Sequence, residues 1–564
     1  MTLGERLERA AGMGEGQGLR FVDRAERETR VDWPEVFARA QRVAGGLHER
    51  GVRPGDTVAI VLPTGIDFFD AFFGALLAGA VPVPLYPPVR LGRLAEYHAR
   101  TVAMLGAARA RILLTDTRLW RILGETVRHA SLPLGCVLTA DVRGAPLVRA
   151  AAPHDLAMVQ FSSGTTVDPK PVALSHANVL SNVRAITAFI VAADGTAEAG
   201  VNWLPLYHDM GLIGCVFPAL CLPGSLTLLG PELFIGRPAL WLRTLGRTRA
   251  TVSPAPNFAY GLCVDRVTDA EMEGVDLSHW RLALNGAEPV SPATLRRFVA
   301  RFSRWGLRPE ALTPVYGLAE ASFAVTFSDW RTPFRTVRFD RAALAEGRAE
   351  PDDAGTELVS VGPPLPGVEI DVPVDRVGPV RVRGPSVMAG YLHQPERTAA
   401  TVVDGWLDTG DLGFLHEGEL YLAGRAKDVV ILRGRNHAPH EIEQAVDAVE
   451  GVRTGCAAAV AWRPEDAEEE QLVVFVEART GTEGLADRCR DAVLEATALL
   501  PALVVVLAPG TLPRTSSGKI RRAETLRLWL AGELVPPEQV GPWMLAGALA
   551  RGTLAHWRVR FART

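Results

Sequence analysis

The stretch TVAIVLPTGIDFFDAFFGALLAGAVPVPL, residues 57–85, decides the fold class of this 564-residue chain. Thr57–Leu62 is a continuous apolar run, as in strands that are buried on both faces. Phe68–Ala78 predicts a helix, and Val81–Leu85 returns to an extended conformation. Before this stretch, apolar residues recur at helical spacing over Trp33–Arg50. Strand, helix and strand at this spacing predict an α/β fold with a parallel sheet.

The alternation of strands and helices continues beyond this stretch and then gives way to other patterns. Six further strand-like runs follow it: Ala110–Asp116, Cys136–Ala140, Gly200–Leu204, Leu226–Leu229, Ala250–Ser253 and Leu282–Leu284. After about Phe327, short β-like runs separated by Gly and Pro predict an antiparallel sheet or barrel: Val359–Val361, Val368–Val372, Val380–Val382 and Leu420–Leu422. After Gly424, a compact pattern predicts a second, smaller domain, with strands at Val429–Leu432, Cys456–Trp462 and Gln471–Glu477 and helices at His440–Val449 and Leu485–Leu499.

Composition and charge exclude several classes of protein. Hydrophobic residues make up 48% and charged residues 22%, which is typical of a globular chain and not of a disordered one. The 60 basic and 64 acidic residues give a net charge of −4. We therefore expect no nucleic acid partner, because such binding needs a clustered basic surface. Six cysteines without a CxxC pair favour a reducing compartment.

The sequence shows neither a secretory signal nor a clear membrane span. The first 21 residues are mixed in charge and have no apolar core, so we expect a cytoplasmic protein. Leu212–Gly230 carries no charge over 19 residues, but it contains Pro218, Pro223 and three glycines. Because these residues would break a spanning helix, the stretch predicts a buried helix, turn and strand and no stable membrane insertion.

A loop rich in hydroxyl groups follows the apolar run Leu156–Val159. It reads FSSGTTVDPK over residues 161–170, and it differs from a Walker A loop. Its backbone and hydroxyl donors suit a polyphosphate, which presents many acceptor oxygens in a small volume. The candidate phosphate-binding residues are Ser162, Ser163, Gly164, Thr165, Thr166 and Lys170.

Seven motifs in a fixed order connect this loop to the rest of the chain. They are SSGTT with PK (162–170), NWLPLYHDMGLIG (202–214), NGAEPV (285–290), PVYGLAEA (314–321), GWLDTGDLG (405–413), LAGRAKDVVILRGRNHAPHEIE (422–443) and LPRTSSGKIRR (512–522). The ordered set spans nearly the whole chain and resembles the adenylate-forming superfamily. Within it, LYHDMGLIG and RGRNHAPHEIE are most similar to the fatty acyl-AMP ligases.

The resemblance implies a two-domain architecture. Residues 1–425 would form a large AMP-binding domain, with parallel-sheet αβ subdomains and a β-barrel-like subdomain. Residues 426–525 would form a small, mobile α+β domain that carries the catalytic lysine, and 526–564 a C-terminal tail. Lys427 would lie at the hinge between the domains.

The implied reaction activates a medium- or long-chain fatty acid with ATP and Mg²⁺ and releases pyrophosphate. By resemblance, Lys519 bridges the carboxylate and the α-phosphate, His208 orients the carboxylate, and Glu320 organises the metal ion. The acyl group would then pass to the phosphopantetheine thiol of an acyl carrier protein, or of a carrier domain in a polyketide or peptide synthase. The uncharged stretch 212–230 and Pro254–Leu262 are the expected walls of the acyl pocket.

The resemblance also assigns residues to the nucleotide. Asn285, Gly286 and Ala287 would line the adenine edge, Tyr316 beside Gly317 would stack on the ring, Asp411 would accept hydrogen bonds from the ribose hydroxyls, and Arg425 would lie near the ribose and phosphates. An ionised carboxylate has two oxygens for the ribose hydroxyls.

Two other functions stay open at this point. Residues 327–358 resemble an insertion that fatty acyl-AMP ligases have and ordinary CoA ligases lack. The insertion is expected to disfavour CoA as the acceptor, and if it does not, the chain would be a fatty acyl-CoA ligase. Val167 and Asp168 depart from the usual phosphate loop. That departure leaves room for a non-catalytic module that binds an acyl-adenylate or a nucleotide.

Overall fold

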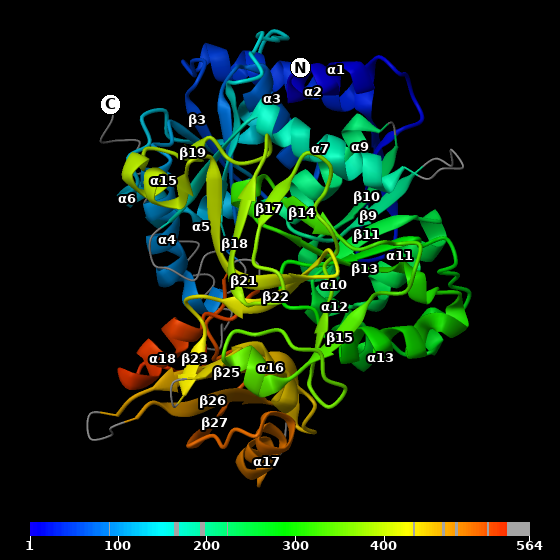
Figure 1. The fold of residues 1–564 in the computed structure, drawn as a ribbon. Helices are drawn as coiled ribbons and strands as arrows, with labels where there is room; N and C mark the ends of the chain where they lie inside the picture. The colour runs from blue at the N-terminus through cyan, green and yellow to red at the C-terminus, as the bar shows by residue number, and fades with distance from the viewer. Residues whose placement is uncertain are drawn as a thin grey trace.

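The computed structural model describes residues 1–88, 91–162, 169–191, 198–222, 224–432, 435–464, 469–479, 483–515 and 518–537. Four of the predicted phosphate-binding residues lie outside this part of the chain: Ser163, Gly164, Thr165 and Thr166. Most of the predicted tail also lies outside it. Figure 1 shows a larger body, coloured blue to yellow, above a smaller domain that holds α16, α17 and α18.

A parallel sheet begins the larger body, as the sequence predicts. Its strand order is β4-β3-β5-β6, and all three pairings are parallel. The strands are β3 (Thr57–Val61), β4 (Val81–Leu85), β5 (Ile112–Thr115) and β6 (Cys136–Leu138). Helix α3 (Ile66–Leu77) joins β3 to β4, and its four phenylalanines are all buried. A helix that is apolar on all sides belongs inside a large core, which explains its place here.

An eight-stranded sheet forms the centre of the larger body. Its order is β14-β13-β12-β11-β9-β10-β1-β2, parallel between β13 and β1 and antiparallel at both ends. The strands are β1 (Gly18–Val22), β2 (Glu28–Asp32), β9 (Ala199–Asn202), β10 (Ser225–Leu229), β11 (Val252–Ala255), β12 (Leu282–Asn285), β13 (Leu312–Gly317) and β14 (Ala324–Phe327). The register aligns Ala255, Asn285 and Pro314. The carboxyl ends of β11, β12 and β13 therefore meet at one edge, where α/β sheets usually bind their ligands.

Helices and a short third sheet complete the larger body. The third sheet has the order β19-β8-β7. Its strands are β7 (Leu156–Phe161), β8 (Pro171–Ser175) and β19 (Gly390–Tyr391). The helices include α2 (Trp33–Glu49), α4 (Leu94–Ala107), α7 (His176–Ile190), α11 (Ala239–Thr248), α12 (Asn257–Arg266) and α13 (Pro292–Phe302). Aromatic rings of α11, α12 and α13 pack edge to face, with 5.8 Å between the centroids of Trp241 and Tyr260 and 5.0 Å between those of Tyr260 and Phe298. This packing fixes α12 and α13, which border the site described below.

The uncharged stretch 212–230 folds as the sequence predicts. A π-helical turn (Leu212–Val216) and α9 (Phe217–Cys221) precede strand β10, with residue 223 outside the described part. Among the described residues, no helix is both long and apolar enough to span a membrane.

Antiparallel strands follow from residue 369, as predicted. They are β17 (Glu369–Asp371), β18 (Gly378–Arg383), β20 (Val402–Val403), β21 (Trp406–His416) and β22 (Glu419–Arg425). Residues 327–358 contribute β15 (Thr336–Phe339), α14 (Arg341–Ala345) and β16 (Thr356–Val359). Phe339 joins this segment to β21 and β22, since its ring lies 5.0 Å from that of Phe414 and 5.6 Å from that of Tyr421.

The small domain is a three-stranded sheet with helices on both faces. Its strands are β25 (Val452–Trp462), β26 (Gln471–Ala478) and β27 (Leu503–Leu507), and a hairpin of β23 (Val430–Leu432) and β24 (Arg435–His437) precedes them. Helices α16 (Pro439–Asp447) and α17 (Leu485–Thr497) pack on one face, and α18 (Arg522–Leu530) packs on the other. The sequence pattern found α16, β25, β26 and α17 but missed β27.

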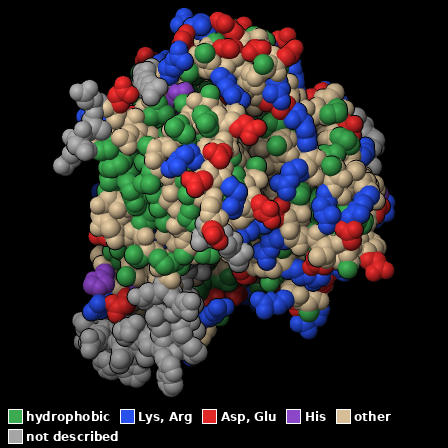
Figure 2. Space-filling model, turned by 90° about the horizontal axis from the view of Figure 1, so that it is seen from below, with side chains coloured by type: hydrophobic (Ala, Val, Ile, Leu, Met, Phe, Trp, Pro, Cys, Tyr) green, Lys and Arg blue, Asp and Glu red, His purple; other side chains and the backbone are tan. Residues whose placement is uncertain are grey.

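Figure 2 shows the molecule from below, the side of the small domain. On the right of this view, Lys and Arg side chains are mixed with Asp and Glu, whereas hydrophobic side chains gather on the left.

Candidate active site

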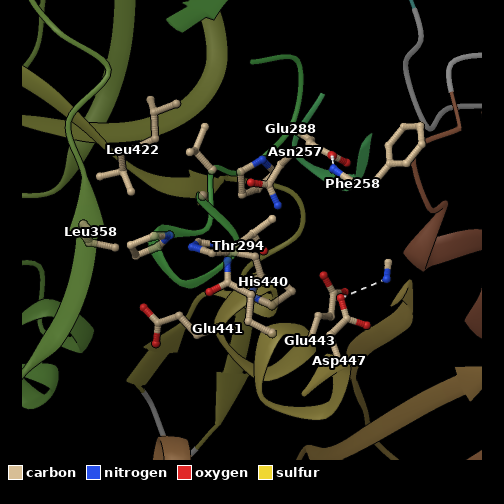
Figure 3. Close-up of a pocket in the computed structure, with 18 of the residues that line it drawn as sticks. Asn257, Phe258, Glu288, Thr294, Leu358, Leu422, His440, Glu441, Glu443 and Asp447 are labelled. Carbon is tan, nitrogen blue, oxygen red and sulfur yellow. Dashed lines mark hydrogen bonds between the residues drawn. The ribbon is translucent and has the colours of Figure 1, made fainter. Parts of the chain in front are cut away.

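A cavity of about 550 Å³ lies between the larger body and the small domain. Figure 3 shows His440, Glu441, Glu443 and Asp447 of α16 on one side of it and Asn257, Phe258 and Glu288 of the larger body on the other. Six of the residues predicted from the motifs line this cavity together: Ala287, Tyr316, Gly317, Asp411, Arg425 and Lys519. The fold thus brings residues from five motifs to one place.

Asp411 is the centre of a buried polar cluster. Strand β21 pairs with β22 so that Asp411 lies opposite Arg425, whose Nε donates to Asp411 Oδ1 at 2.9 Å. Tyr316 donates its hydroxyl hydrogen to Asp411 Oδ2 at 2.7 Å. The Asp411 carboxylate raises the pKa of Arg425. Burial, followed by the Asp411 charge, raises the pKa of Tyr316 well above its usual range. These contacts hold the Asp411 carboxylate at the cavity wall.

Small residues beside the cavity are required by backbone packing. A Cβ atom at Gly317 would lie 1.8 Å from the carbonyl oxygen of Phe323, and one at Gly286 would lie 2.8 Å from that of Val315. Ala287 has a φ of 69°, in the left-handed region that non-glycine residues rarely adopt. The two glycines therefore allow close packing of β12, β13 and the turns that follow them. From the sequence, both were predicted only as nucleotide-binding residues.

Asn285 lies beneath the cavity wall and does not line it. Its side chain is fully buried, and Nδ2 donates to Asn257 Oδ1 at 3.3 Å. Asn257 is itself a lining residue at the start of α12. The structure thus places Asn285 behind the residue that faces the cavity, and its Oδ1 has no hydrogen-bond partner within the described structure.

Glu320 and Lys170 lie near each other at the end of the sheet that contains β8 and β19. Glu320 is only 9% exposed, and its Oε1 accepts a hydrogen bond of 3.0 Å from the Tyr391 hydroxyl. Lys170 Nζ lies 5.7 Å from the centre of the Tyr391 ring. Burial lowers the pKa of Lys170, although the Glu320 charge opposes this shift. At the base of the predicted phosphate loop, the Ser162 N–H donates to the Lys170 carbonyl oxygen at 3.3 Å.

His208 is held by its neighbour in the sequence. Its Nδ1 lies 2.6 Å from Asp209 Oδ1, which also accepts the Met210 N–H at 2.7 Å. Burial tends to raise the pKa of Asp209, but the charge of His208 and the charge of Lys519 lower it on balance. Neither His208 nor Asp209 is among the described residues that line the cavity.

Lys519 ends a tight turn of the small domain. The Thr515 N–H donates to the Lys519 carbonyl oxygen at 2.8 Å, and the Gly518 N–H donates to the Thr515 carbonyl oxygen at 3.0 Å. Burial and the charge of Arg425 lower the pKa of Lys519, whereas Asp209, Asp411 and Glu288 oppose that shift. The four charges that shift the pKa of Lys519 all belong to the larger body. Lys519 also lines the cavity beside residues of that body, so it projects from the small domain toward the larger body.

Two acidic residues that face the same cavity were not predicted from the sequence: Glu288 and Asp447. Glu288 belongs to the NGAEPV motif; its Oε1 accepts the Phe258 N–H at 2.5 Å, and burial raises its pKa. Burial raises the pKa of Asp447 to about 7, and its Oδ2 accepts the Gly455 N–H at 3.0 Å. The NGAEPV motif could have indicated Glu288 as a site residue. Asp447 lies outside the motifs, and only the position of α16 in the structure shows that it faces the cavity.

A second, smaller cavity has a volume of about 50 Å³. Its lining joins the predicted acyl wall to the central sheet: Gly214, Cys215, Pro218, Ala219 and Leu222 face Gly200, Val201, Val252 and Pro254. A Cβ atom at Gly214 would lie 2.7 Å from the ring of Phe323, which is itself buried. An aromatic ring therefore covers the glycine at this wall.

Comparisons with known proteins agree with the site. Residues 9–392 match the family model described as "AMP-binding enzyme". A 4-hydroxyphenylalkanoate adenylyltransferase of Mycobacterium marinum is 35% identical over 538 residues, 87% of this chain and 85% of that protein. The long-chain-fatty-acid–AMP ligase FadD26 of the same species is 36% identical over 539 residues, 87% of this chain and 90% of that protein.

The solved structures give the same result. A chain from a study of fatty acyl-adenylate ligases from E. coli and L. pneumophila superposes with a TM-score of 0.87 and 31% sequence identity. The superposition covers 94% of this chain and 98% of that one. The protein therefore belongs to the AMP-binding, or adenylate-forming, enzyme family, and the resemblance to the fatty acyl-AMP ligases predicted from its motifs is confirmed.

Proposed function

We propose that this enzyme is a fatty acyl-AMP ligase that activates a medium- or long-chain fatty acid as its acyl-adenylate. The single observation that supports this most is the position of Lys519, which shares one cavity with Tyr316, Asp411 and Arg425 although it belongs to the small domain. The long-chain-fatty-acid–AMP ligase FadD26 named above supports the same substrate class. The free thiol state of all six cysteines supports a cytoplasmic location.

The reaction joins two anions, so the site must neutralise charge and fix an in-line geometry. A carboxylate oxygen of the fatty acid attacks the α-phosphorus of ATP, and the bond to the pyrophosphate oxygen breaks. No proton has to be removed first, since a fatty carboxylate is already ionised near pH 7. In this proposal the Lys519 ammonium lies between the two anions, and His208, fixed by Asp209, orients the carboxylate.

The nucleotide would bind on the larger body. Asp411 would accept hydrogen bonds from the ribose hydroxyls through lone pairs that Tyr316 and Arg425 leave open, since each carboxylate oxygen has two acceptor sites. Ala287 and Gly317 would border the adenine. The remaining predicted contacts stay part of this proposal: Ser162, Ser163, Gly164, Thr165, Thr166 and Lys170 with the phosphates, and Asn285 and Gly286 behind the adenine edge.

Glu320 fits the proposed magnesium ion. Mg²⁺ is usually held by one or two carboxylates together with substrate phosphates, and Glu320 offers a buried carboxylate with one oxygen fixed by Tyr391. No group of three or more potential ligands is found among the described residues, which agrees with an ion held jointly with the nucleotide. When bound, the ion would neutralise charge on the leaving pyrophosphate.

We further propose that the small domain, residues 426–525, turns about Lys427 after adenylation and that the acyl group then passes to a carrier-bound phosphopantetheine thiol. The Ala426 N–H still bonds to the Gly410 carbonyl oxygen at 3.1 Å, while Lys427 is exposed. The 327–358 insertion supports a carrier over CoA, because Glu346 at the end of α14 lies 3.8 Å from Arg435 of the small domain. Both side chains are exposed, so the ion pair itself is weak; in this proposal it marks the place where α14 would meet the small domain and limit its movement.

Pyrophosphate release with a graded series of fatty acids tests the adenylation step. Release should require both ATP and a fatty acid, and Lys519→Ala should abolish it while ATP binding remains. Tight ATP binding without release for any acid would instead support a non-catalytic nucleotide-binding module.

Mass spectrometry of the products tests the acceptor. With CoA and a phosphopantetheinylated carrier both present, acyl-carrier should be the main product. Abundant acyl-CoA would favour the alternative function, a fatty acyl-CoA ligase.

A further inference from the structure

A polar contact between the two domains centres on Asp265, near the end of α12. Thr454 of the small domain donates its hydroxyl hydrogen to Asp265 Oδ2 at 2.5 Å, and Arg479 Nη2 donates to the same oxygen at 3.1 Å. Arg297 of α13 donates to Asp265 Oδ1 at 2.7 Å from the other side. The Asp265 side chain is only 13% exposed, so solvent screens these contacts less than it screens surface ion pairs.

The small-domain side of this contact is a bulge in β25. The pairing of β25 with β26 shifts register between Val452 and Ala457, and Gly455 within the bulge has a φ of 66°. The Gly455 N–H donates to Asp447 Oδ2 of α16 at 3.0 Å. The bulge is thus fixed from both sides, by Asp265 of the larger body and by Asp447 of its own domain.

Arg514 connects this bulge to the lysine turn. Its Nη2 donates to the Gly455 carbonyl oxygen at 2.6 Å, and its Nη1 donates to the Gly518 carbonyl oxygen at 2.6 Å. Gly518 directly precedes Lys519. The planar guanidinium therefore spans from a residue beside the domain contact to a residue beside the lysine, a geometry that a single ammonium group does not reproduce.

We propose that Asp265, Thr454 and Arg514 form a positioning relay that places Lys519 in the cavity only when the small domain is docked on α12. The relay rests on the proposed adenylation function. When the small domain is docked, Asp265 fixes the position of Thr454 and therefore of Gly455 in the same bulge. Arg514 bonds to both Gly455 and Gly518, so it fixes the position of Lys519, which follows Gly518. Thr454 and Arg514 themselves line the cavity, whereas Asp265 is not among its lining residues, so Asp265→Asn tests positioning without changing the cavity wall.

Steady-state pyrophosphate release from the full-length enzyme tests the relay. Arg514→Lys should lower kcat by about tenfold or more, since charge-assisted hydrogen bonds are lost, and should leave the KM for ATP unchanged because the nucleotide residues lie on the larger body. Thr454→Val, which removes only the hydroxyl, should lower kcat, and Thr454→Ser should restore it. The combination of Thr454→Val with Arg514→Lys should be no slower than Arg514→Lys alone, because the residues act in series.

Asp269→Asn is the matched control for Asp265→Asn. Asp269 lies close to α12 and pairs with Arg301 and Arg304 of the larger body, so its replacement should leave kcat near the wild-type value. The relay is wrong if Arg514→Lys keeps the wild-type kcat, if Thr454→Val and Thr454→Ser behave alike, or if the two effects multiply.

A measurement without fatty acid separates the relay from the substrate assignment. The rate at which an amine-reactive acylating reagent modifies Lys519, read by mass spectrometry, reports how far the lysine is buried in the cavity. This rate should rise in Asp265→Asn and Thr454→Val but not in Asp269→Asn, and equal rates in all variants would overturn the relay. Absence of pyrophosphate release from the wild type would count against the proposed function alone.

Discussion

Lys519 combines a positive charge with a buried position, which predicts a pH dependence. Burial and Arg425 lower its pKa from the ordinary value of 10.5. In the proposed step only the charged lysine stabilises the meeting anions. The rate of pyrophosphate release should therefore fall as the pH rises through the lysine pKa, at a pH below 10.5.

A pH–rate profile of the adenylation step checks this prediction. Lys519→Arg keeps a charge at all accessible pH values, because a guanidinium stays protonated. This variant should lose the decline at high pH, even if its rate is lower throughout. An unchanged decline in Lys519→Arg would assign the titration to another group.

Asp411 supplies a second prediction at the scale of single residues. Its carboxylate accepts hydrogen bonds from Tyr316 and Arg425 and, in the proposed function, from the ribose. Asp411→Ala removes charge-assisted hydrogen bonds that are each worth about 1.5–3 kcal/mol. The KM for ATP should rise by about tenfold or more, since 1.4 kcal/mol corresponds to a factor of ten.

Tyr316→Phe separates two possible causes of that effect. It removes the phenolic hydroxyl but keeps the ring and the carboxylate, so ATP should bind more tightly to it than to Asp411→Ala. Nucleotide titration by calorimetry gives the dissociation constants directly. Wild-type affinity in Asp411→Ala would contradict the ribose role.

At the scale of helices and strands, periodicity predicted much of the fold and failed where polar side chains interrupt a strand. The apolar run Thr57–Leu62 became β3, and the pattern over His440–Val449 became α16. Strand β21 was missed, because Asp408, Thr409 and Asp411 give it the composition of a loop. Of these three residues, Asp411 lines the cavity, so the local pattern and the function of this strand conflict there.

The site was predictable as a set of motifs but not as a geometry. The sequence indicated Tyr316, Asp411 and Lys519 through their motifs, and the structure places all three at one cavity. It could not indicate that Thr454 would bond to Asp265, because 189 residues separate them and each stands outside the quoted motifs. Such contacts depend on how two domains dock, which no local pattern encodes.

The 327–358 insertion leads to a prediction at the same scale. Residues 341–349 can be replaced by Asn-Gly, a pair that favours tight two-residue hairpin turns, because the Asp340 N–H already bonds to the Glu350 carbonyl oxygen at 2.8 Å. The shortened enzyme loses α14 and its contact with the small domain but keeps Phe339 against Phe414. If the insertion restrains the small domain, acyl-CoA should now form.

Product analysis with CoA as the sole acceptor measures this effect. Pyrophosphate release and the melting temperature report whether the shortened enzyme still folds, so they serve as controls. Full adenylation activity without any acyl-CoA would show that the insertion does not set the choice of acceptor.

At the scale of the whole molecule, the structure represents one of the two arrangements that the proposed reaction requires. Lys519 projects into the cavity, and Asp265 holds the small domain through Thr454. In this arrangement the small domain covers the side of the cavity that α16 lines. A thiol acceptor would therefore need the small domain to move, and a covalent link across the interface should separate the two half-reactions.

A disulfide between residues 258 and 455 would provide that link. A Cβ atom built at Gly455 lies 3.6 Å from the Cβ of Phe258, within the range of about 3.5–4.5 Å that disulfides show. The left-handed φ of 66° at Gly455 adds strain to any side chain there, and the single variant Gly455→Cys measures its effect. Oxidised Phe258→Cys/Gly455→Cys enzyme should form acyl-adenylate and release pyrophosphate but should not acylate a carrier, and dithiothreitol should restore transfer. Each single variant, treated with the same oxidant, controls for the mutations and for oxidation of the native thiols. Carrier acylation at the wild-type rate by fully cross-linked enzyme would mean that the docked arrangement already admits the thiol, and that the small domain has no need to turn.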